Sequence, residues 1–350
     1  MTSYAVRAGI ILEPNGEPAE AEGVLNPACT RTREGELLLY PRCVAKGNVS
    51  RIGILQAHGS PEAPAFMRIG YALEPQAPYE LRSEPGGYGC EDPRVTFIKD
   101  LDTYVMAYVA HGPNGPRIGI AVSHDAYAWE RLGVVSFAPG LPNGLDKDAA
   151  FFPDLVLSPS GVLSFALYHR PTLFISTEGL LAMPLPDRES TRIAYIHADP
   201  VLLDRMKLLE VSESACVLEP VTQWGQLKTG AGTPPVRIDE GWLSVYHAVD
   251  AIADEDGRFR VKYQAGLVVH DLMSPHIVRY RSPEPILSPE TFAELHGVVN
   301  NVVFPTAIDV RADIAARTYD IYYGMADSRI GLVRMGIAAS MTAEGTDLAA

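Results

Sequence analysis

Nine consecutive residues, Gly86 to Arg94, combine side chains that suit acid–base chemistry. Three glycines in four residues permit a sharp turn, and Pro93 then keeps Asp92 out of helical geometry. Glu91, Asp92 and Arg94 come just before a short apolar run that has the character of a buried strand. Two carboxylates and a guanidinium at the beginning of a strand suit proton transfer. A solvated cluster at a strand-leading turn is the structural alternative.

Composition narrows the classes of function. The chain has 350 residues, of which 47% are hydrophobic and 21% charged, so it can bury a large core. The net charge is −14 and there is no Lys/Arg-rich run, so neither nucleic acid nor an anionic membrane is expected as a partner. The four scattered cysteines lack metal-ligand spacing, so we expect neither disulfides nor a metal site. Residues 1–16 contain acid and proline where a signal peptide needs an apolar run, which favours a cytoplasmic location.

An internal repeat indicates the fold class. Five segments of small or apolar residues end in tyrosine: Leu37–Tyr40, Tyr104–Tyr108, Leu163–Tyr168, Trp242–Tyr246 and Tyr319–Tyr323. A turn and a second strand follow each copy; in three copies this strand begins Arg-Ile-Gly, and Tyr263–Leu267 occupies the same place in a fourth. Units of about 70 residues suit a four-stranded sheet with loops. We therefore predict an all-β protein, a five-bladed β-propeller that forms one domain over residues 1–350; chance similarity among strands is the alternative.

Polar residues recur just past the repeated strands. They are Arg42, Arg51, His111, His169, Arg170, His247, Asp250 and Asp327. In a propeller, equivalent strand ends converge on one mouth of the central channel, so these residues are predicted to meet in a funnel. Each of them alone is more typical of a solvated loop.

Several motifs in this order resemble those of glycoside hydrolase family 130, the β-mannoside phosphorylases and related β-mannosidases. They are Asn26-Pro27-Ala28, Leu39–Arg42, Glu91–Arg94, Lys147–Ala149, His169–Pro171, Gly230–Val236, Tyr246-His247, Phe304-Pro305 and Tyr322–Asp327. The resemblance extends over nearly the whole chain. It implies a five-bladed propeller, in agreement with the repeat.

The resemblance also implies an activity and roles. The expected reaction is inverting phosphorolysis of β-mannosides, of the mannosyl-glucose or mannooligosaccharide type, to α-mannose 1-phosphate. Asp92 would be the general acid, and inorganic phosphate the co-substrate, with no other cofactor. Expected phosphate-binding residues are Arg51, Lys147, His169 and Arg170. Expected substrate-binding residues are Asn26, Arg42, Arg94, Asp148, Tyr246, His247, Asp250 and Asp327.

Alternatives remain for the activity and for single residues. A hydrolase of the same family would need a second carboxylate to activate water, whereas the basic residues favour phosphate. A non-catalytic carbohydrate-binding propeller is a third hypothesis. Arg42 and Arg170 could instead bridge neighbouring blades. The proton could pass directly or through a sugar hydroxyl, and a homo-oligomer is compatible with the sequence.

Overall fold

The computed structural model describes residues 3–338 except 61, 85, 143, 174, 254 and 255. Strands dominate it, so the all-β prediction is confirmed. The α-helices are α1 (Thr177–Ala182), α2 (Ala198–Leu203) and α3 (Phe292–Leu295), and the 3-10 helices are η1 (Pro18–Glu20), η2 (Lys99–Leu101), η3 (Leu185–Asp187) and η4 (Arg205–Leu209). Within the described ranges, no helix has the length and apolar character needed to cross a membrane.

Strand pairing divides the described residues into five consecutive antiparallel groups. Group 1 contains β2 (Gly23–Arg31), β3 (Leu37–Ala45), β4 (Val49–Ser60) and β5 (Ala63–Leu73). Group 2 contains β6 (Tyr88–Ile98), β7 (Thr103–Gly112), β8 (Gly115–Ser123) and β9 (Glu130–Val134). A short parallel pairing of β4 with β6 joins these two groups into one sheet.

The remaining groups follow the same order of strands. Group 3 contains β11 (Asp146–Phe151), β13 (Leu163–Pro171), β14 (Thr191–His197) and β16 (Glu213–Leu218), with β12 (Val156–Leu157) beside β13. Group 4 contains β17 (Lys228–Ala231), β19 (Gly241–Ala253), β20 (Phe259–His270) and β21 (Val278–Arg281), with β18 (Val236–Ile238) beside β19. Group 5 contains β22 (Val303–Val310), β23 (Thr318–Met325), β24 (Arg329–Ile337) and β1 (Ser3–Leu12). A separate parallel pair joins β10 (Ser136–Phe137) to β15 (Glu210–Val211).

The tyrosine-ending segments occupy equivalent places, as the repeat predicts. Each lies in the second strand of its group, namely β3, β7, β13, β19 and β23. The repeat has a packing reason in at least two groups: Tyr108 pairs with Gly119, and Tyr323 with Gly331. A Cβ added to either glycine would lie within 2.6 Å of the paired tyrosine ring. The missing side chain therefore makes room for the ring on the same face of the sheet.

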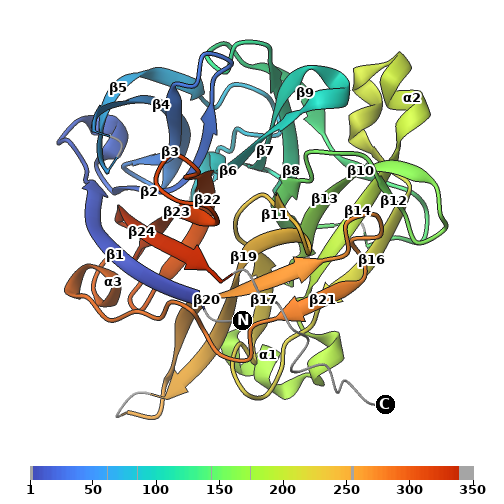
Figure 1. The fold of residues 1–350 in the computed structure, drawn as a ribbon. Coiled ribbons are helices and arrows are strands. Elements are labelled where there is room, and N and C mark those ends of the chain that lie inside the picture. Colours follow the sequence, from blue (N-terminus) through green and yellow to red (C-terminus); the bar gives the residue numbers. More distant parts are fainter. Residues whose placement is uncertain are drawn as a thin grey trace.

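Each group shares a hydrophobic core with the next group along the chain, and group 5 shares one with group 1. Figure 1 shows this order as a passage from blue through green to orange, with the red group beside the blue one. Both faces of a strand such as β7 are consequently buried, which explains its nearly continuous apolar sequence.

Group 3 differs from the others in one connection. Its second and third strands are joined by residues 172–190, which contain α1 and η3. The corresponding connections elsewhere span only residues 46–48, 113–114, 254–258 and 326–328. We call residues 172–190 the insertion. Its helix α1 contacts β20 of group 4.

Candidate active site

Three first strands carry the same local irregularity. The pairing register shifts at a β-bulge in β2, β6 and β11, and each bulge holds one residue with positive φ. These residues are Asn26 (φ 42°), Asp92 (φ 46°) and Asp148 (φ 60°). Asparagine and aspartate tolerate this left-handed conformation better than most residues do. The bulges therefore turn three short polar side chains out of the regular alternation of their strands.

A cavity of about 580 Å³ lies where these strands meet. Its polar lining comprises Asn26, Arg42, Asp92, Lys147, Asp148, Arg170, Thr172, Thr177, Glu189, Lys228 and Asp327. Its apolar and aromatic lining comprises Leu173, Ile175, Leu180, Leu227, Val261, Tyr263, Val299, Val302 and Phe304. Seven of the residues predicted from the sequence thus share one cavity: Asn26, Arg42, Asp92, Lys147, Asp148, Arg170 and Asp327.

Asp92 has one engaged and one available carboxylate oxygen. Its Oδ1 accepts hydrogen bonds from Asn26 Nδ2 at 2.9 Å and from an Arg42 guanidinium nitrogen at 3.3 Å. No side chain of the described residues bonds Oδ2. The carboxyl group is therefore held in place at the cavity wall while one oxygen remains able to meet a ligand.

Glu91, the neighbouring acid, is engaged differently. It is buried and lies 3.2 Å from Arg42, 3.1 Å from His111 Nδ1 and 3.8 Å from Lys147 Nζ. Burial acts to raise its pKa, but Arg42, Lys147 and His111 together hold that pKa well below its usual value. Both acids contact Arg42, because the bulge at Asp92 interrupts the alternation expected of an extended segment. Glu91 does not line the cavity, so it serves to fix cations around Asp92.

Asp327 approaches the cavity from the turn between β23 and β24, also with positive φ (50°). Burial raises its pKa to about 6; Arg42 opposes this shift and the Asp92 carboxylate adds to it. No ion pair or side-chain hydrogen bond from the described residues reaches it. Asp327 is therefore a carboxyl group that exchanges its proton close to neutral pH.

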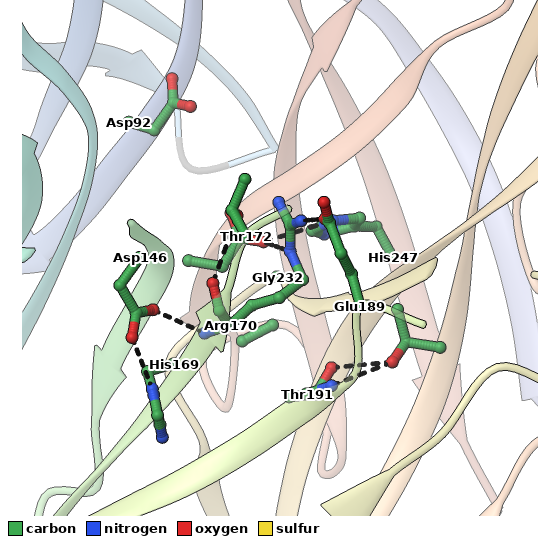
Figure 2. A network of polar contacts seen from close by, with 12 residues as sticks. Asp92, Asp146, His169, Arg170, Thr172, Glu189, Thr191, Gly232 and His247 are labelled. Carbon is green, nitrogen blue, oxygen red and sulfur yellow. Dashed lines mark hydrogen bonds and ion pairs between the residues drawn. The ribbon is translucent and has the colours of Figure 1, made fainter. Parts of the chain in front are cut away.

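Arg170 is the centre of a buried ion-pair network (Figure 2). Its Nε donates to Asp148 at 2.6 Å, and a second guanidinium nitrogen donates to Glu189. Burial acts to raise the pKa of Asp148, whereas Arg170, His247 and Arg94 hold it well below its usual value. Asp148 is thus a permanent anion that orients Arg170. Glu189 also accepts from the Leu173 amide at 2.9 Å, which ties the insertion to this network.

Arg94 and His247 support the site from behind. The buried Arg94 guanidinium donates to the backbone oxygens of Asp92, Ala231 and Gly232, each at 3.0 Å, and so clamps β6 to the β17 segment. His247 packs on Phe304 with ring centroids 4.5 Å apart, and burial lowers its pKa to about 3. Neither residue lines the cavity, and the substrate contacts predicted for them stay predictions.

Two lysines supply the other cationic groups of the cavity. Lys147 is 28% exposed and has Glu91, at 3.8 Å, as its ion-pair partner. Lys228 Nζ lies 5.5 Å from the centre of the Tyr263 ring. By contrast, Arg42 and Arg170 are each fixed by carboxylates. Arg42 joins group 1 to group 2, as the structural alternative anticipated, whereas Arg170 pairs with Asp148 and Glu189 of its own group.

Besides Arg94 and His247, four residues predicted as ligands lie outside the cavity lining: Arg51, His169, Tyr246 and Asp250. His169 is fully buried; its Nδ1 bonds Asp146 and its Nε2 bonds Ser214, both at 2.8 Å. Figure 2 shows its ring directed away from Asp92. The reason is alternation along β13, which sends His169 and Arg170 to opposite faces. His169 thus lies outside the cavity lining with both ring nitrogens engaged, and its phosphate contact stays a prediction.

The other three are displaced for similar reasons. Arg51 lies over the Tyr71 ring on the face of β4 opposite to Ser50, which bonds Arg42. The Tyr246 hydroxyl accepts from Arg281, and its ring packs on Trp224. Asp250 accepts from the Gln226 amide and the Gln264 side chain. These intramolecular contacts engage the three side chains away from the cavity, and their ligand roles stay predictions.

Sequence reasoning missed thirteen residues of the cavity lining, of which four are charged or aromatic: Glu189, Lys228, Tyr263 and Phe304. Two had a usable signal. Tyr263–Leu267 follows its repeated strand as the Arg-Ile-Gly segments do in three other units, and Phe304 precedes a proline in a first strand as Asn26 and Asp92 do. Glu189 belongs to the insertion and had no such signal.

Comparisons with known proteins agree with this geometry. The family model described as beta-1,4-mannooligosaccharide phosphorylase, of glycoside hydrolase family 130, matches residues 9–175 and 191–343. A 1,2-beta-oligomannan phosphorylase of Thermoanaerobacter sp. (strain X514) is 30% identical over 81% of this chain and 78% of its own length. A beta-1,4-mannooligosaccharide phosphorylase of Ruminococcus albus is 37% identical over 70% of this chain and 62% of its own length.

A solved structure extends the comparison to the fold. The beta-1,2-mannobiose phosphorylase of Listeria innocua, in complex with beta-1,2-mannobiose, superposes with a TM-score of 0.69 at 22% identity. It covers 95% of this chain and 97% of its own. The match to the family model and to the Thermoanaerobacter relative leads to one assignment: the chain belongs to glycoside hydrolase family 130.

Proposed function

We propose that this protein is an inverting phosphorylase of β-mannosides that releases α-mannose 1-phosphate, with Asp92 as general acid. One observation carries the assignment of the acid. Asp92 presents an unengaged oxygen to the cavity, whereas Glu91 is buried against three cationic or ionisable groups. Family membership and the names of the relatives support the reaction class.

We further infer that the five groups are the blades of a β-propeller and that the cavity is the mouth of its channel. The cyclic order of shared cores supports this arrangement. Contacts between first strands support it too: β22 contacts β2, β2 contacts β6, β6 contacts β11, and β11 contacts β17. The ring returns to β22 through β19 and β20.

The reaction needs a proton, an in-line nucleophile and a held sugar. An oxygen of phosphate attacks C1 of the mannosyl residue from the face opposite to the leaving oxygen. The C1–O bond to the leaving group breaks, and its oxygen takes the proton of Asp92, directly or through a sugar hydroxyl. Inversion at C1 gives the α-phosphate. Asn26 and Asp327 are positioned at the Asp92 end of the cavity to bond sugar hydroxyls.

The phosphate site follows from the charge balance of the cavity. Arg170 is compensated by Asp148 and Glu189, and Arg42 by Glu91 and Asp92. Lys147 and Lys228 are less compensated, and flexible ammonium groups readily bind phosphate as point charges. We therefore assign phosphate binding to these two lysines, with Arg170 at the border, and not to Arg51 or His169.

Hydrolysis is the second candidate, and Asp327 is the observation that favours it. It is a cavity carboxyl without an ion-pair partner among the described residues, as the base of an inverting hydrolase would be. Incubation with β-mannobiose or mannosyl-glucose, with and without phosphate, separates the candidates. Phosphate-dependent α-mannose 1-phosphate supports the phosphorylase, free mannose supports the hydrolase, and no product supports a binding protein.

The acid is tested by Asp92→Asn, which keeps the size of the side chain and tolerates the positive φ. Loss of general acid catalysis should lower kcat by about 10²–10⁴-fold on a natural mannoside. An aryl mannoside with a good leaving group should lose less. Near-normal turnover of Asp92→Asn, with loss of turnover in Glu91→Gln, would assign the acid to Glu91 instead.

A further inference from the structure

Glu189 is a buried carboxylate near the end of the insertion, and it lines the cavity. One of its side-chain oxygens accepts from the Leu173 amide at 2.9 Å, and the other accepts from Arg170 (Figure 2). Its backbone oxygen accepts from the Thr229 amide at 3.1 Å. Glu189 is thereby held between Arg170 and β17, the strand that carries Lys228.

Cationic residues of the cavity lie on both sides of this carboxylate. Lys147 of β11 pairs directly with Arg170 of β13, so their side chains share one face of the sheet. Lys228 is the neighbour of Thr229, whose amide bonds Glu189. Among the described residues, Lys228 has no carboxylate partner. An anion bound between Arg170 and Lys228 therefore meets the Glu189 carboxylate as well.

The Glu189 carboxylate retains the capacity to accept further hydrogen bonds. An ionised carboxylate has roughly four acceptor positions and no donor. The Leu173 amide and Arg170 use one position on each oxygen. A ligand oxygen that comes next to Glu189 must therefore carry a proton, because an oxygen without one would face the carboxylate as a second unpaired negative group.

Glu189 also lies outside the segments that the family model matches. The matched segments end at residue 175 and resume at residue 191. Lys147, Arg170 and Lys228 all lie inside them. The cations of this side of the cavity are thus accounted for by the family match, whereas the carboxylate between them is not.

We propose that Glu189 is a specificity-determining residue of the phosphate site, which makes the site select an oxyanion that carries a proton and reject one that does not. This rests on the proposed phosphorolysis. Inorganic phosphate retains a P–OH group as HPO4²⁻, and that group donates to Glu189 while the other oxygens accept from Arg170 and Lys228. Sulfate, SO4²⁻, has the same charge and a similar size but no proton to donate.

Competition between the two anions provides the test. The KM for phosphate and the inhibition constant of sulfate against phosphate are measured in slightly alkaline buffer, with the mannoside that gives product in the assay of the proposed function. A hydrogen bond to a charged group changes binding by about tenfold or more. The inhibition constant of sulfate should exceed the KM for phosphate by at least that factor in the wild type. Similar values of the two constants overturn the inference.

Glu189→Gln removes the charge and keeps an oxygen that can accept from the Leu173 amide, while Asp148 still holds Arg170 Nε at 2.6 Å. The ratio of the two constants should fall to within about threefold of one, because the amide can donate to either anion. Glu189→Ala is a second variant and should lower the ratio in the same direction. Glu213→Gln is the matched control, since Glu213 is a carboxylate of group 3 that does not line the cavity; it should keep the wild-type ratio.

Other outcomes of these measurements also decide the inference. A folded Glu189→Gln that keeps the wild-type ratio overturns it. Loss of both anions by this variant, with unchanged urea denaturation, would show that Glu189 only orients Arg170, and overturns it too. Arsenate provides a check on the wild type alone, because HAsO4²⁻ carries a proton. It should compete within about threefold of phosphate, and rejection of arsenate as strong as that of sulfate overturns the inference.

Failure of the proposed function is distinguishable from failure of this inference. Equal binding of phosphate and sulfate by an enzyme that forms α-mannose 1-phosphate overturns the inference and leaves phosphorolysis standing. No phosphate-dependent product overturns the proposed function, and calorimetric titration of the wild type with phosphate and with sulfate then decides the inference. A preference for phosphate that is lost in Glu189→Gln supports it, and equal or undetectable binding of both anions overturns it.

Discussion

The raised pKa of Asp327 makes a quantitative prediction for Asp327→Asn. An unfolded chain ionises an aspartate near pH 3.9, whereas folded Asp327 ionises at about 6. The folded state therefore binds this proton more tightly, and the stability it contributes is lost as the pH rises from about 4 through 6. Asparagine carries no such proton and is compatible with the positive φ of this position.

The difference between the two pKa values sets the magnitude. Two pKa units correspond to about 2–3 kcal/mol. The free energy of unfolding of Asp327→Asn relative to wild type should increase by about that amount between pH 4 and pH 8, with most of the change below pH 6. Urea denaturation of both proteins at several pH values across this range measures it.

Asp92→Asn provides the control for the contribution of the neighbouring negative charge to the raised pKa of Asp327. The Asp92 carboxylate helps to raise the pKa of Asp327, so the neutral variant should make the pH dependence assigned to Asp327 smaller. Parallel stability curves for wild type and Asp327→Asn from pH 4 to pH 8 would show that Asp327 is an ordinary carboxylate, and the reasoning would be refuted.

Three further predictions concern single side chains. Lys147→Ala should raise the KM for phosphate by about tenfold or more, because hydrogen bonds to charged groups contribute about 1.5–3 kcal/mol. His169→Asn should leave the KM for phosphate near the wild-type value. Initial rates measured as a function of phosphate concentration check both predictions. Arg94→Met leaves three backbone oxygens without their buried donor and should cost about 3–5 kcal/mol of stability in urea denaturation. Gly230→Ala would place a Cβ 2.3 Å from Asp148 Oδ2. This variant should lower kcat and reduce the free energy of unfolding by about 1–3 kcal/mol. An unchanged kcat would contradict the role of the Asp148 carboxylate in orienting Arg170.

The five-unit organisation was predictable because it rests on local patterns. The repeated second strands place Tyr108 opposite Gly119 and Tyr323 opposite Gly331, and such pairs leave a trace at fixed spacing in the sequence. The motif around Asp92 was also predictable, because glycine and proline restrict backbone geometry in ways that the sequence alone reveals.

The directions of side chains near the site were harder to predict. Alternation sends His169 away from the cavity and Arg170 toward it, yet a sequence does not state which of two neighbours faces inward. The bulge at Asp92 breaks alternation, so that Glu91 and Asp92 both reach Arg42. A register shift of one residue depends on pairing with a distant strand, and the periodicity of a single segment cannot encode it.

The pairing of β1 with β24 has a consequence for how the protein is made. These strands are joined in antiparallel register although more than 300 residues separate them in the chain, from Ser3 against Ile337 to Leu12 against Ile330. β1 must therefore wait, with its backbone groups unpaired along this edge, until β24 has been synthesised more than 300 residues later. Contacts between residues so far apart in sequence slow the final folding step, because forming them costs the conformational entropy of a very long loop. The same late pairing completes the sheet of group 5.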